Sequence, residues 1–360
     1  MKSSEHASRR DRTAAEFVGD GLDALLVSNP INVRYLSGFT GDNSLLLLSP
    51  DRSVLITDGR YRVQAAEETD CPVKIGRGPL LEAAATLFRR GSKLRLGFEA
   101  ADLTVEKHNS FSALLPPGVT LLPARDLILE QRMVKSASEI EKIRRSAALT
   151  CKALSQALRC IRPGVKELEV AAEIDHRMRR LGAEAPAFET IVAFGERSAM
   201  PHARPGRKSL TAGEIVLIDM GATLDGYASD MTRTLVAGRA GPKVRRLYKA
   251  VLEAQLTALA EVREGVTAAQ VDRAARRPLR KAGLDGAFVH ATGHGLGLEI
   301  HEPPRLGRKV ATSLKAGMAI TIEPGVYLQG FGGVRIEDTV VVTRNGCEIL
   351  TPTSKELLEY

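Results

Sequence analysis

Three apolar runs, each bounded by polar or turn-forming residues, stand out in the first part of the chain. They are A-L-L-V within residues 21–28, L-L-L-L within 44–49 and V-L-I-T within 53–58. Short runs of this kind are typical of buried strands. Helical stretches such as V-Q-A-A-E-E at 63–68 alternate with them. The alternation predicts an α/β domain of parallel or mixed strands.

The pattern changes near residues 127–135, where a second region begins. Ser136 is followed three positions later by Glu139, which is the spacing of a helix capping box. We therefore expect the second region to open with a long helix. The sequence predicts two domains, 1–130 and 131–360.

The second region contains one pattern twice. S-L-x-A-G-x-x-x-x-I-[acid]-x-G runs from 209 to 221 and again from 313 to 325. R-x-G-V and a helical pattern precede each copy, and an acid with a threonine two positions later follows each copy. Self-similarity of this kind marks a repeated supersecondary module. We predict a duplicated α+β unit whose facing halves bring together four carboxylates, those of Asp219, Asp230, Glu323 and Glu337.

Strand alternation orients these acids. The segment G-A-T-L-D-G-Y between Asp219 and Asp230 predicts two strands joined by a turn, because Gly and Asp are turn formers. Side chains two positions apart on a strand share a face, so both acids can point into one cleft with Thr232 beside Asp230. Arg335 and Glu337 share a face for the same reason.

Four acids in one cleft require compensation, since like charges a few ångströms apart cannot all stay ionised. Bound cations are the usual compensation. An imidazole is available in H-A-T-G-H-G-L-G-L-E-I-H-E at 290–302. An oxygen-rich set with one imidazole suits Mn²⁺ or a similar divalent ion. His290 and His294 have the spacing of a helical zinc pair, but the surrounding glycines disfavour a helix there.

Four motifs carry a resemblance to a known family. They are I-D-M-G-A-x-x-D-G-Y-x-S-D-M-T-R-T at 218–234, the histidine segment at 290–302, I-T-I-E-P-G-V-Y at 320–327 and G-V-R-I-E-D-T at 333–339. The sequence resembles the pita-bread metallopeptidases, and within them the Xaa-Pro aminopeptidases and Xaa-Pro dipeptidases (prolidases). The resemblance implies two divalent ions, with Mn²⁺ expected and Co²⁺ or Zn²⁺ as alternatives. It implies that Asp230 and Glu337 bridge both ions, that Asp219 binds one, and that His294 and Glu323 bind the other.

The resemblance also implies roles for the remaining site residues. Two cations would lower the pKa of a shared water, so that a bridging hydroxide attacks the scissile bond. Glu323 is expected to accept the proton of that water. His301 would hydrogen-bond the substrate carbonyl or the tetrahedral intermediate, His202 would contact substrate, and His290 is a weaker candidate for substrate contact. Arg335 would pair with an acid of the site or with a substrate carboxylate.

The first domain resembles the creatinase-like N-terminal domain of prolidase relatives, through N-P-I-N-V-R-Y-L-S-G-F and I-T-D-G-R-Y. Its presence disfavours a methionyl aminopeptidase. The resemblance implies a homodimer in which this domain reaches toward a neighbouring active site. Asp58, Arg60 and Tyr61 are then candidate substrate contacts, with an internal ion pair or a turn as the alternative interpretation.

The substrates implied are proline-containing peptides. Because I-T-D-G-R-Y and the short chain resemble bacterial aminopeptidases, we expect an Xaa-Pro aminopeptidase, with an Xaa-Pro dipeptidase as the alternative. A non-catalytic peptide-binding protein of the same fold and a creatinase-type amidinohydrolase are further alternatives. Both are disfavoured, since all five ligand positions are filled.

Composition and charge exclude several other classes. The chain has 360 residues, 44% of them hydrophobic, and no apolar stretch long enough for a membrane span. No apolar segment of the kind found in secretory signals follows the basic N-terminus, and the four scattered cysteines are typical of reduced thiols in a cytoplasmic protein. The net charge of +8 lies largely in helical clusters without interleaved aromatic residues, which favours solvated helix faces over nucleic-acid binding. Pro278 is expected to kink or end its helix.

Overall fold

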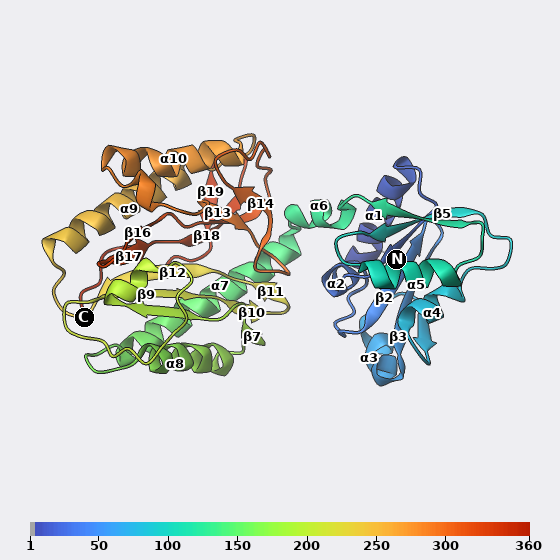
Figure 1. The fold of residues 1–360 in the computed structure, drawn as a ribbon, viewed down its shortest axis with the longest axis horizontal. Helices are drawn as coiled ribbons and strands as arrows, with labels where there is room; N and C mark the ends of the chain where they lie inside the picture. The colour runs from blue at the N-terminus through green and yellow to red at the C-terminus, as the bar shows by residue number, and fades with distance from the viewer. Residues whose placement is uncertain (1–3) are drawn as a thin grey trace. The chain divides into compact units, whose positions relative to one another are not determined.

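The computed structural model describes residues 4–360 and separates into two compact units, one ending at Gln131 and the other running from Arg132 to Tyr360 (Figure 1). The sequence predicts that the N-terminal segment is not a secretory signal. The first three residues of this segment lie outside the described residues, and the rest leads into helix α1, Glu5–Gly19. Among residues 4–360, no helix is both long enough and apolar enough to cross a membrane.

The first unit is built on one mixed sheet with the strand order β4-β3-β2-β1-β5-β6. Strand β1 pairs antiparallel with β2 and parallel with β5. The three predicted strands are confirmed as β1, β2 and β3, and the mixed pairing agrees with the predicted α/β class. The strands are β1 Ala24–Val27, β2 Ser44–Ser49, β3 Arg52–Asp58, β4 Val73–Gly76, β5 Leu94–Glu99 and β6 Val119–Ala124.

Helices bury both faces of the central strands in this sheet. Every residue of β1 is buried, which explains why its sequence is a continuous apolar run without alternation. One face packs against α4 and α5 through side chains such as Leu26, Ile56 and Phe111. The other helices of the unit are α1, α2 Pro30–Ser37, α3 Arg62–Glu68 and α6 Leu127–Met133, and the two on the packed face are α4 Leu80–Ala85 and α5 Val105–Leu114.

The second unit opens with the predicted long helix, α7, Ala137–Ala157. The capping box is confirmed: Glu139 N donates to Ser136 Oγ at 3.3 Å, and Ser136 N donates to Glu139 Oε2 at 2.8 Å. Two unpaired N–H groups of the helix start are thereby satisfied. The other helices are α8 Glu167–Arg180, α9 Pro242–Glu261 and α10 Ala268–Lys281.

The strands of this unit form small sheets that follow the two halves of the repeat. The first half gives the sheets β12-β9-β8 and β11-β10-β7, and the second half gives β14-β13-β15-β18-β19 and β16-β17. Their bounds are β7 Ala185–Pro186, β8 Ile191–Phe194, β9 Ile215–Met220, β10 Ala222–Leu224, β11 Tyr227–Ala228, β12 Met231–Val236, β13 Gly293–Gly295, β14 Glu302–Leu306, β15 Ala319–Ile322, β16 Gly325–Leu328, β17 Gly332–Arg335, β18 Asp338–Val342 and β19 Cys347–Ile349.

The same backbone bonds occur at equivalent places in both copies, as the duplication predicts. Gly164 N donates to Leu210 O at 2.8 Å, and Gly265 N donates to Leu314 O at 2.9 Å. Each of these loops leads into a helix, α8 or α10, and each is bridged to the serine that opens its copy of the pattern. The second unit is therefore a duplicated α+β structure.

The predicted hairpin inside the first copy is confirmed. Strands β10 and β11 pair antiparallel, and Asp225 and Gly226 make the turn with φ of 51° and 78°. Both torsion angles lie in the left-handed region, where Gly is unstrained and Asp is tolerated.

The prediction for Pro278 is wrong about where the helix ends. Helix α10 continues past it to Lys281, and Pro278 is buried. Proline has no N–H, so the bond to the Ala274 carbonyl is missing, yet the helix continues for three more residues. The four cysteines, Cys71, Cys151, Cys160 and Cys347, are free thiols.

Candidate metal centre

All nine predicted site residues line one cavity of about 730 Å³ in the second unit. The five expected ligands come from strands or strand ends of both copies of the repeat. Asp219 lies in β9, Asp230 directly precedes β12, His294 lies in β13, Glu323 directly follows β15, and Glu337 directly precedes β18. The remaining four are His202, His290, His301 and Arg335.

Threonine hydroxyls hold the two copies together beside the acids. Thr232, which pairs with Asp219 across the β9–β12 ladder, donates its hydroxyl to Glu337 Oε2 at 2.7 Å. Thr339 donates its hydroxyl to the carbonyl of Asp230 at 2.8 Å. The hydroxyl of Thr232 thus bonds an acid of the other copy, whereas the sequence placed it beside Asp230 on its own strand.

Burial and neighbouring acids raise the pKa values of three acids of the site, Asp230, Glu323 and Glu337. Burial raises the pKa of Asp230 well above its ordinary value, and the charges of Glu337, Asp219 and Glu323 raise it further. Burial and the charges of Glu323 and Asp219 do the same for the pKa of Glu337. Burial raises the pKa of Glu323 to about 7, although the Arg335 charge opposes this. Such a cluster carries its full negative charge near neutral pH only when cations lie beside it.

His294 directs one ring nitrogen toward these acids. Its Nδ1 lies 3.0 Å from the carbonyl oxygen of Gly295, which can only accept, so Nδ1 carries the proton. Its Nε2 lies 3.5 Å from both Asp230 Oδ2 and Glu323 Oε1. Burial lowers the pKa of His294, which favours the neutral ring. A bare nitrogen facing carboxylates is the arrangement of a histidine that binds a metal and donates its other N–H to the main chain.

The donor set fits divalent cations. Asp230, His294 and Glu337 each offer one atom, and these atoms lie within 4.8 Å of one another. The Oδ1 atoms of Asp219 and Asp230 are buried, and within residues 4–360 no hydrogen-bond donor reaches them. Buried carboxylate oxygens without a donor are costly and need an explanation. Cations between these oxygens and His294 would supply it.

Arg335 is the cation that the protein itself places in the site. Its side chain is 3% exposed, and Nη2 donates to Asp219 Oδ2 at 2.6 Å. Nε donates to Thr232 Oγ1 at 3.0 Å and Nη1 to the Tyr327 hydroxyl at 2.6 Å. The sequence predicts that Arg335 pairs either with an acid of the site or with a substrate carboxylate. The structure shows the pair with an acid of the site, Asp219.

The three remaining histidines lie around the same cavity. His290 Nδ1 lies 2.8 Å from the Ala291 carbonyl, and its Nε2 accepts from the Tyr327 hydroxyl at 2.9 Å. Burial and the charge of Arg335 lower its pKa to about 4, so the ring is neutral. The His301 ring centroid lies 4.4 Å from that of His294, and partial burial and His294 lower its pKa.

Two other residues contribute to the site that sequence reasoning did not select. Tyr327 is the last residue of one of the quoted motifs, and its hydroxyl forms hydrogen bonds with both Arg335 and His290. Its neighbours in the sequence are apolar strand residues, which do not indicate this role. Arg305 lines the cavity four positions after His301. Only its position just beyond the histidine segment could have indicated it.

The candidate residues of the first unit form an internal ion pair. Arg60 Nη2 donates to Asp58 Oδ2 at 2.8 Å, and the hydroxyl of Tyr61 bonds Asp42. Asp58 also accepts from the Asn43 amide at 2.5 Å. These contacts match the alternative interpretation, in which the segment is a structural turn.

The fold and the site define a metallopeptidase of the pita-bread class. Two family comparisons agree with this description. The sequence profile of metallopeptidase family M24 matches residues 141–344, and that of the creatinase/prolidase N-terminal domain matches residues 9–134. The chain belongs to metallopeptidase family M24 and is a metal-dependent peptidase.

Relatives and solved structures cover nearly the whole chain. An Xaa-Pro dipeptidase of Pyrococcus furiosus is 38% identical over 348 residues, covering 94% of this chain and 96% of the relative. The structure of an Xaa-Pro dipeptidase from Bacillus anthracis matches with a TM-score of 0.94 at 36% identity, covering 98% of this chain and 99% of that one. The structure of an X-Pro aminopeptidase from Thermotoga maritima matches with a TM-score of 0.88 at 36% identity, covering 94% and 97%.

Proposed function

We propose that this protein hydrolyses the bond between the first residue of a peptide and a following proline. The observation that carries the proposal is the cavity in which four acids and His294 converge with two donor-free carboxylate oxygens. The names of the relatives, which include Xaa-Pro dipeptidases and an X-Pro aminopeptidase, supply the substrate class. Asp219, Asp230, His294, Glu323 and Glu337 are the proposed ligands of two divalent ions, with Mn²⁺ as the proposed metal.

Divalent ions bound there would activate a water and polarise the scissile carbonyl. The chain's own residues would position substrate and move protons. Glu323 faces the cavity and is the proposed acceptor of the water proton. His301, whose pKa is lowered, is neutral near pH 7 and has an N–H to donate to the substrate carbonyl oxygen. His202 lines the same cavity and is a proposed substrate contact, with His290 as a weaker candidate.

Recognition of proline must depend on shape. An Xaa-Pro bond has no N–H, so a site cannot select it through that donor. Phe188, Ile191, Ile300 and Pro303 line the cavity and supply an apolar wall that suits a pyrrolidine ring.

We propose a dipeptide as the preferred substrate. Arg335 is already bound to Asp219, but Arg305 also lines the cavity, and within the described chain its guanidinium pairs with no carboxylate. We therefore assign the free carboxylate of an Xaa-Pro dipeptide to Arg305 and give up the aminopeptidase preference suggested by the short chain. The resemblance to the Thermotoga X-Pro aminopeptidase keeps that activity as the second candidate.

The test is hydrolysis of Ala-Pro and Ala-Pro-Ala by Mn²⁺-loaded protein. We expect a higher kcat/KM for Ala-Pro, and we expect Arg305→Gln to reduce kcat/KM for Ala-Pro more than for Ala-Pro-Ala, because a charge-assisted hydrogen bond is lost. Equal or faster hydrolysis of Ala-Pro-Ala would establish the aminopeptidase instead. No hydrolysis of either peptide would refute the proposed function. A homodimer remains a prediction, which light scattering of the purified protein can test.

A further inference from the structure

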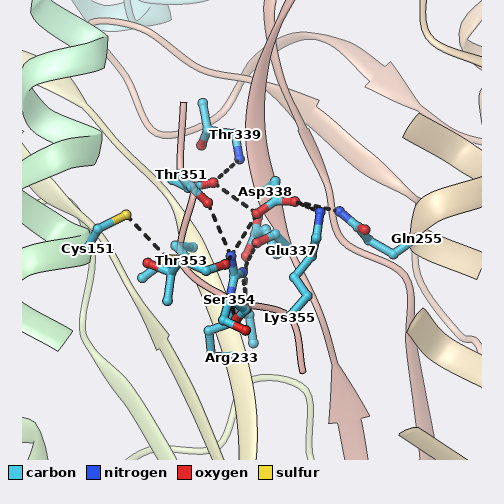
Figure 2. A network of polar contacts seen from close by, with 12 residues as sticks. Cys151, Arg233, Gln255, Glu337, Asp338, Thr339, Thr351, Thr353, Ser354 and Lys355 are labelled. Atoms are coloured by element: carbon cyan, nitrogen blue, oxygen red, sulfur yellow. Dashed lines mark hydrogen bonds and ion pairs between the residues drawn. The ribbon is translucent and has the colours of Figure 1, made fainter. Parts of the chain in front are cut away.

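Arg233 stands at the centre of a buried network that takes no part in the chemistry proposed above (Figure 2). It follows Thr232 on β12, so its side chain points to the opposite face of the strand from the threonine. The side chain is 5% exposed. Its guanidinium donates to one carboxylate oxygen and to five main-chain carbonyl oxygens.

The acceptors belong to three separate segments of the second unit. On its own strand, Arg233 Nη1 donates to the Thr232 carbonyl at 2.9 Å. The same nitrogen donates to the carbonyl of Glu337, and Nη2 donates to Asp338 Oδ1 at 2.8 Å. The third segment is the C-terminal stretch, whose carbonyls accept at Thr351 (3.2 Å), Thr353 (2.7 Å) and Ser354 (3.1 Å). The planar guanidinium of Arg233 thus joins β12, the segment leading into β18 and residues 351–354.

Asp338 orients this fork and is itself fully satisfied. It is completely buried, and its Oδ1 accepts from Arg233 and from the Thr351 hydroxyl at 3.1 Å. Its Oδ2 accepts from the Gln255 amide at 2.8 Å and from Lys355 Nζ at 2.5 Å (Figure 2). Two cations therefore share one carboxylate, which leaves a net positive charge next to Glu337 in the sequence.

We propose that Arg233 is a positioning residue of the metal centre, which holds the main chain of Glu337 so that its carboxylate stays among the other acids. The inference rests on the proposed role of Glu337 as a metal ligand. Glu337 itself lies between β17 and β18, outside either strand, and its N–H donates to the Thr232 carbonyl at 3.2 Å. Arg233 binds both the carbonyl that accepts this bond and the carbonyl of Glu337 itself.

Glu337 needs such an anchor because the other acids of the site repel its carboxylate. Its carboxylate shares one cavity with those of Asp219, Asp230 and Glu323, and like charges so close together repel one another. A loosely held main chain would allow the carboxylate to withdraw from the cavity. Groups that orient metal ligands commonly cost about 10–100-fold in metal affinity or activity when they are changed.

The experiment compares Mn²⁺ binding and Ala-Pro hydrolysis in wild-type protein and in Arg233→Lys. Lysine keeps the positive charge but has no planar fork, so it cannot bridge three segments. We expect calorimetry on the metal-free proteins to give an Mn²⁺ dissociation constant about 10–100-fold higher for the variant. We expect KM for Ala-Pro to stay at the wild-type value at saturating Mn²⁺, since Arg233 does not line the cavity.

Tyr248→Phe is the matched control. The Tyr248 hydroxyl donates to the carbonyl of Lys355 at 3.0 Å, so it anchors the same C-terminal segment through a hydrogen bond that involves neither Arg233 nor Glu337. We expect this variant to melt at a lower temperature than the wild type and to bind Mn²⁺ with wild-type affinity. Asp338→Asn is the second variant, to be used if Arg233→Lys does not fold. It keeps the shape of the side chain, removes the charge that orients the guanidinium, and should also weaken Mn²⁺ binding.

The outcomes separate this inference from the proposed function. Weaker Mn²⁺ binding in Arg233→Lys with wild-type affinity in Tyr248→Phe supports the positioning role. The positioning role is overturned if Arg233→Lys has a lower melting temperature but unchanged Mn²⁺ affinity. Where Asp338→Asn is needed instead, unchanged Mn²⁺ affinity in that variant overturns the role in the same way. Wild-type protein that neither binds Mn²⁺ nor cleaves Ala-Pro overturns the proposed function and this inference together.

Discussion

Glu302→Gln is expected to destabilise the second unit strongly, because Glu302 is the counterion of two buried cations. Arg132 Nη2 donates to Glu302 Oε1 at 2.6 Å, and Lys135 Nζ donates to Oε2 at 3.0 Å. The side chains of these three residues are between 1% and 2% exposed. Glu302 also accepts from the Glu299 N–H at 3.1 Å, so it organises the loop that carries His301 into the cavity. A neutral amide cannot balance the two charges.

The size of the effect follows from this burial. Removing one partner of a buried ion pair costs about 3–5 kcal/mol, because a charge remains without compensation. For a domain of this size, 1 kcal/mol corresponds to roughly 2–4 °C in Tm, so the expected fall is about 6–20 °C. Glu299→Gln is the control. Glu299 also binds Arg132 at 2.6 Å, but its side chain is 40% exposed, and such pairs contribute about 0–1 kcal/mol.

Urea unfolding and calorimetry of the two variants provide the measurement, repeated in acid. Burial opposes ionisation of Glu302, but Lys135 and Arg132 outweigh burial and lower its pKa below the ordinary 4.5. A carboxyl with a lowered folded pKa stabilises the protein above its unfolded pKa, and this contribution is lost as pH falls through the folded value. The stability gap between wild type and Glu302→Gln should therefore narrow below about pH 4.5. Equal losses in Glu302→Gln and Glu299→Gln at neutral pH would refute the reasoning.

Three further predictions concern the metal centre and the cavity around it. Asp230→Asn and Glu337→Gln should each lower the metal content found by elemental analysis and abolish hydrolysis, since each is a proposed ligand of both ions; two ions per chain in both variants would show that the ligands are others. Chelation of the wild-type protein should abolish hydrolysis, and Mn²⁺ should restore it, whereas full activity after thorough removal of metal would exclude a metal-bound nucleophile. His301→Ala should keep its metal yet lose on the order of 10²–10³ in kcat, the typical cost of removing an oxyanion donor. An unchanged kcat would assign His301 a structural role.

The sequence predicted those parts of the structure that depend on local patterns or on the repeat. Ser136 and Glu139 form a capping box from contacts within one helical turn, so their spacing was sufficient. The turn at Asp225 and Gly226 follows from the backbone preferences of Asp and Gly, which both tolerate the left-handed region. The convergence of Asp219 and Glu323 needed the duplication as well, because strands that are equivalent in two copies end at equivalent places. These inferences required no knowledge of distant side chains.

The rest of the site depends on pairings between residues far apart in the chain, and no local pattern specifies these. Arg233 reads as an ordinary polar residue of a strand, and nothing in its neighbourhood shows that residues 351–354 pass beside it. Tyr327 reads as a strand aromatic, yet its hydroxyl is bound by Arg335 and His290. The helix-breaking tendency of Pro278 is a local property, yet α10 continues past this residue to Lys281.

The divergence of the two copies explains why a duplicated unit has an asymmetric site. Equating Asp230 with Glu337 makes Arg335 the counterpart of Ala228. Equating Asp219 with Glu323 makes Val216 the counterpart of Ile320. Val216 pairs with Phe194 on the neighbouring strand, and Ile320 pairs with Gly295. His294, which directly precedes Gly295, is therefore the counterpart of Ala193, which directly precedes Phe194. The duplication therefore supplied two acids from each copy, whereas the second copy alone acquired the imidazole and the arginine. Because that arginine binds Asp219 and the imidazole faces Asp230 and Glu323, the two sides of the cavity carry different charge. The two ions proposed for the site would therefore have different surroundings, although the repeat by itself would give them the same ones.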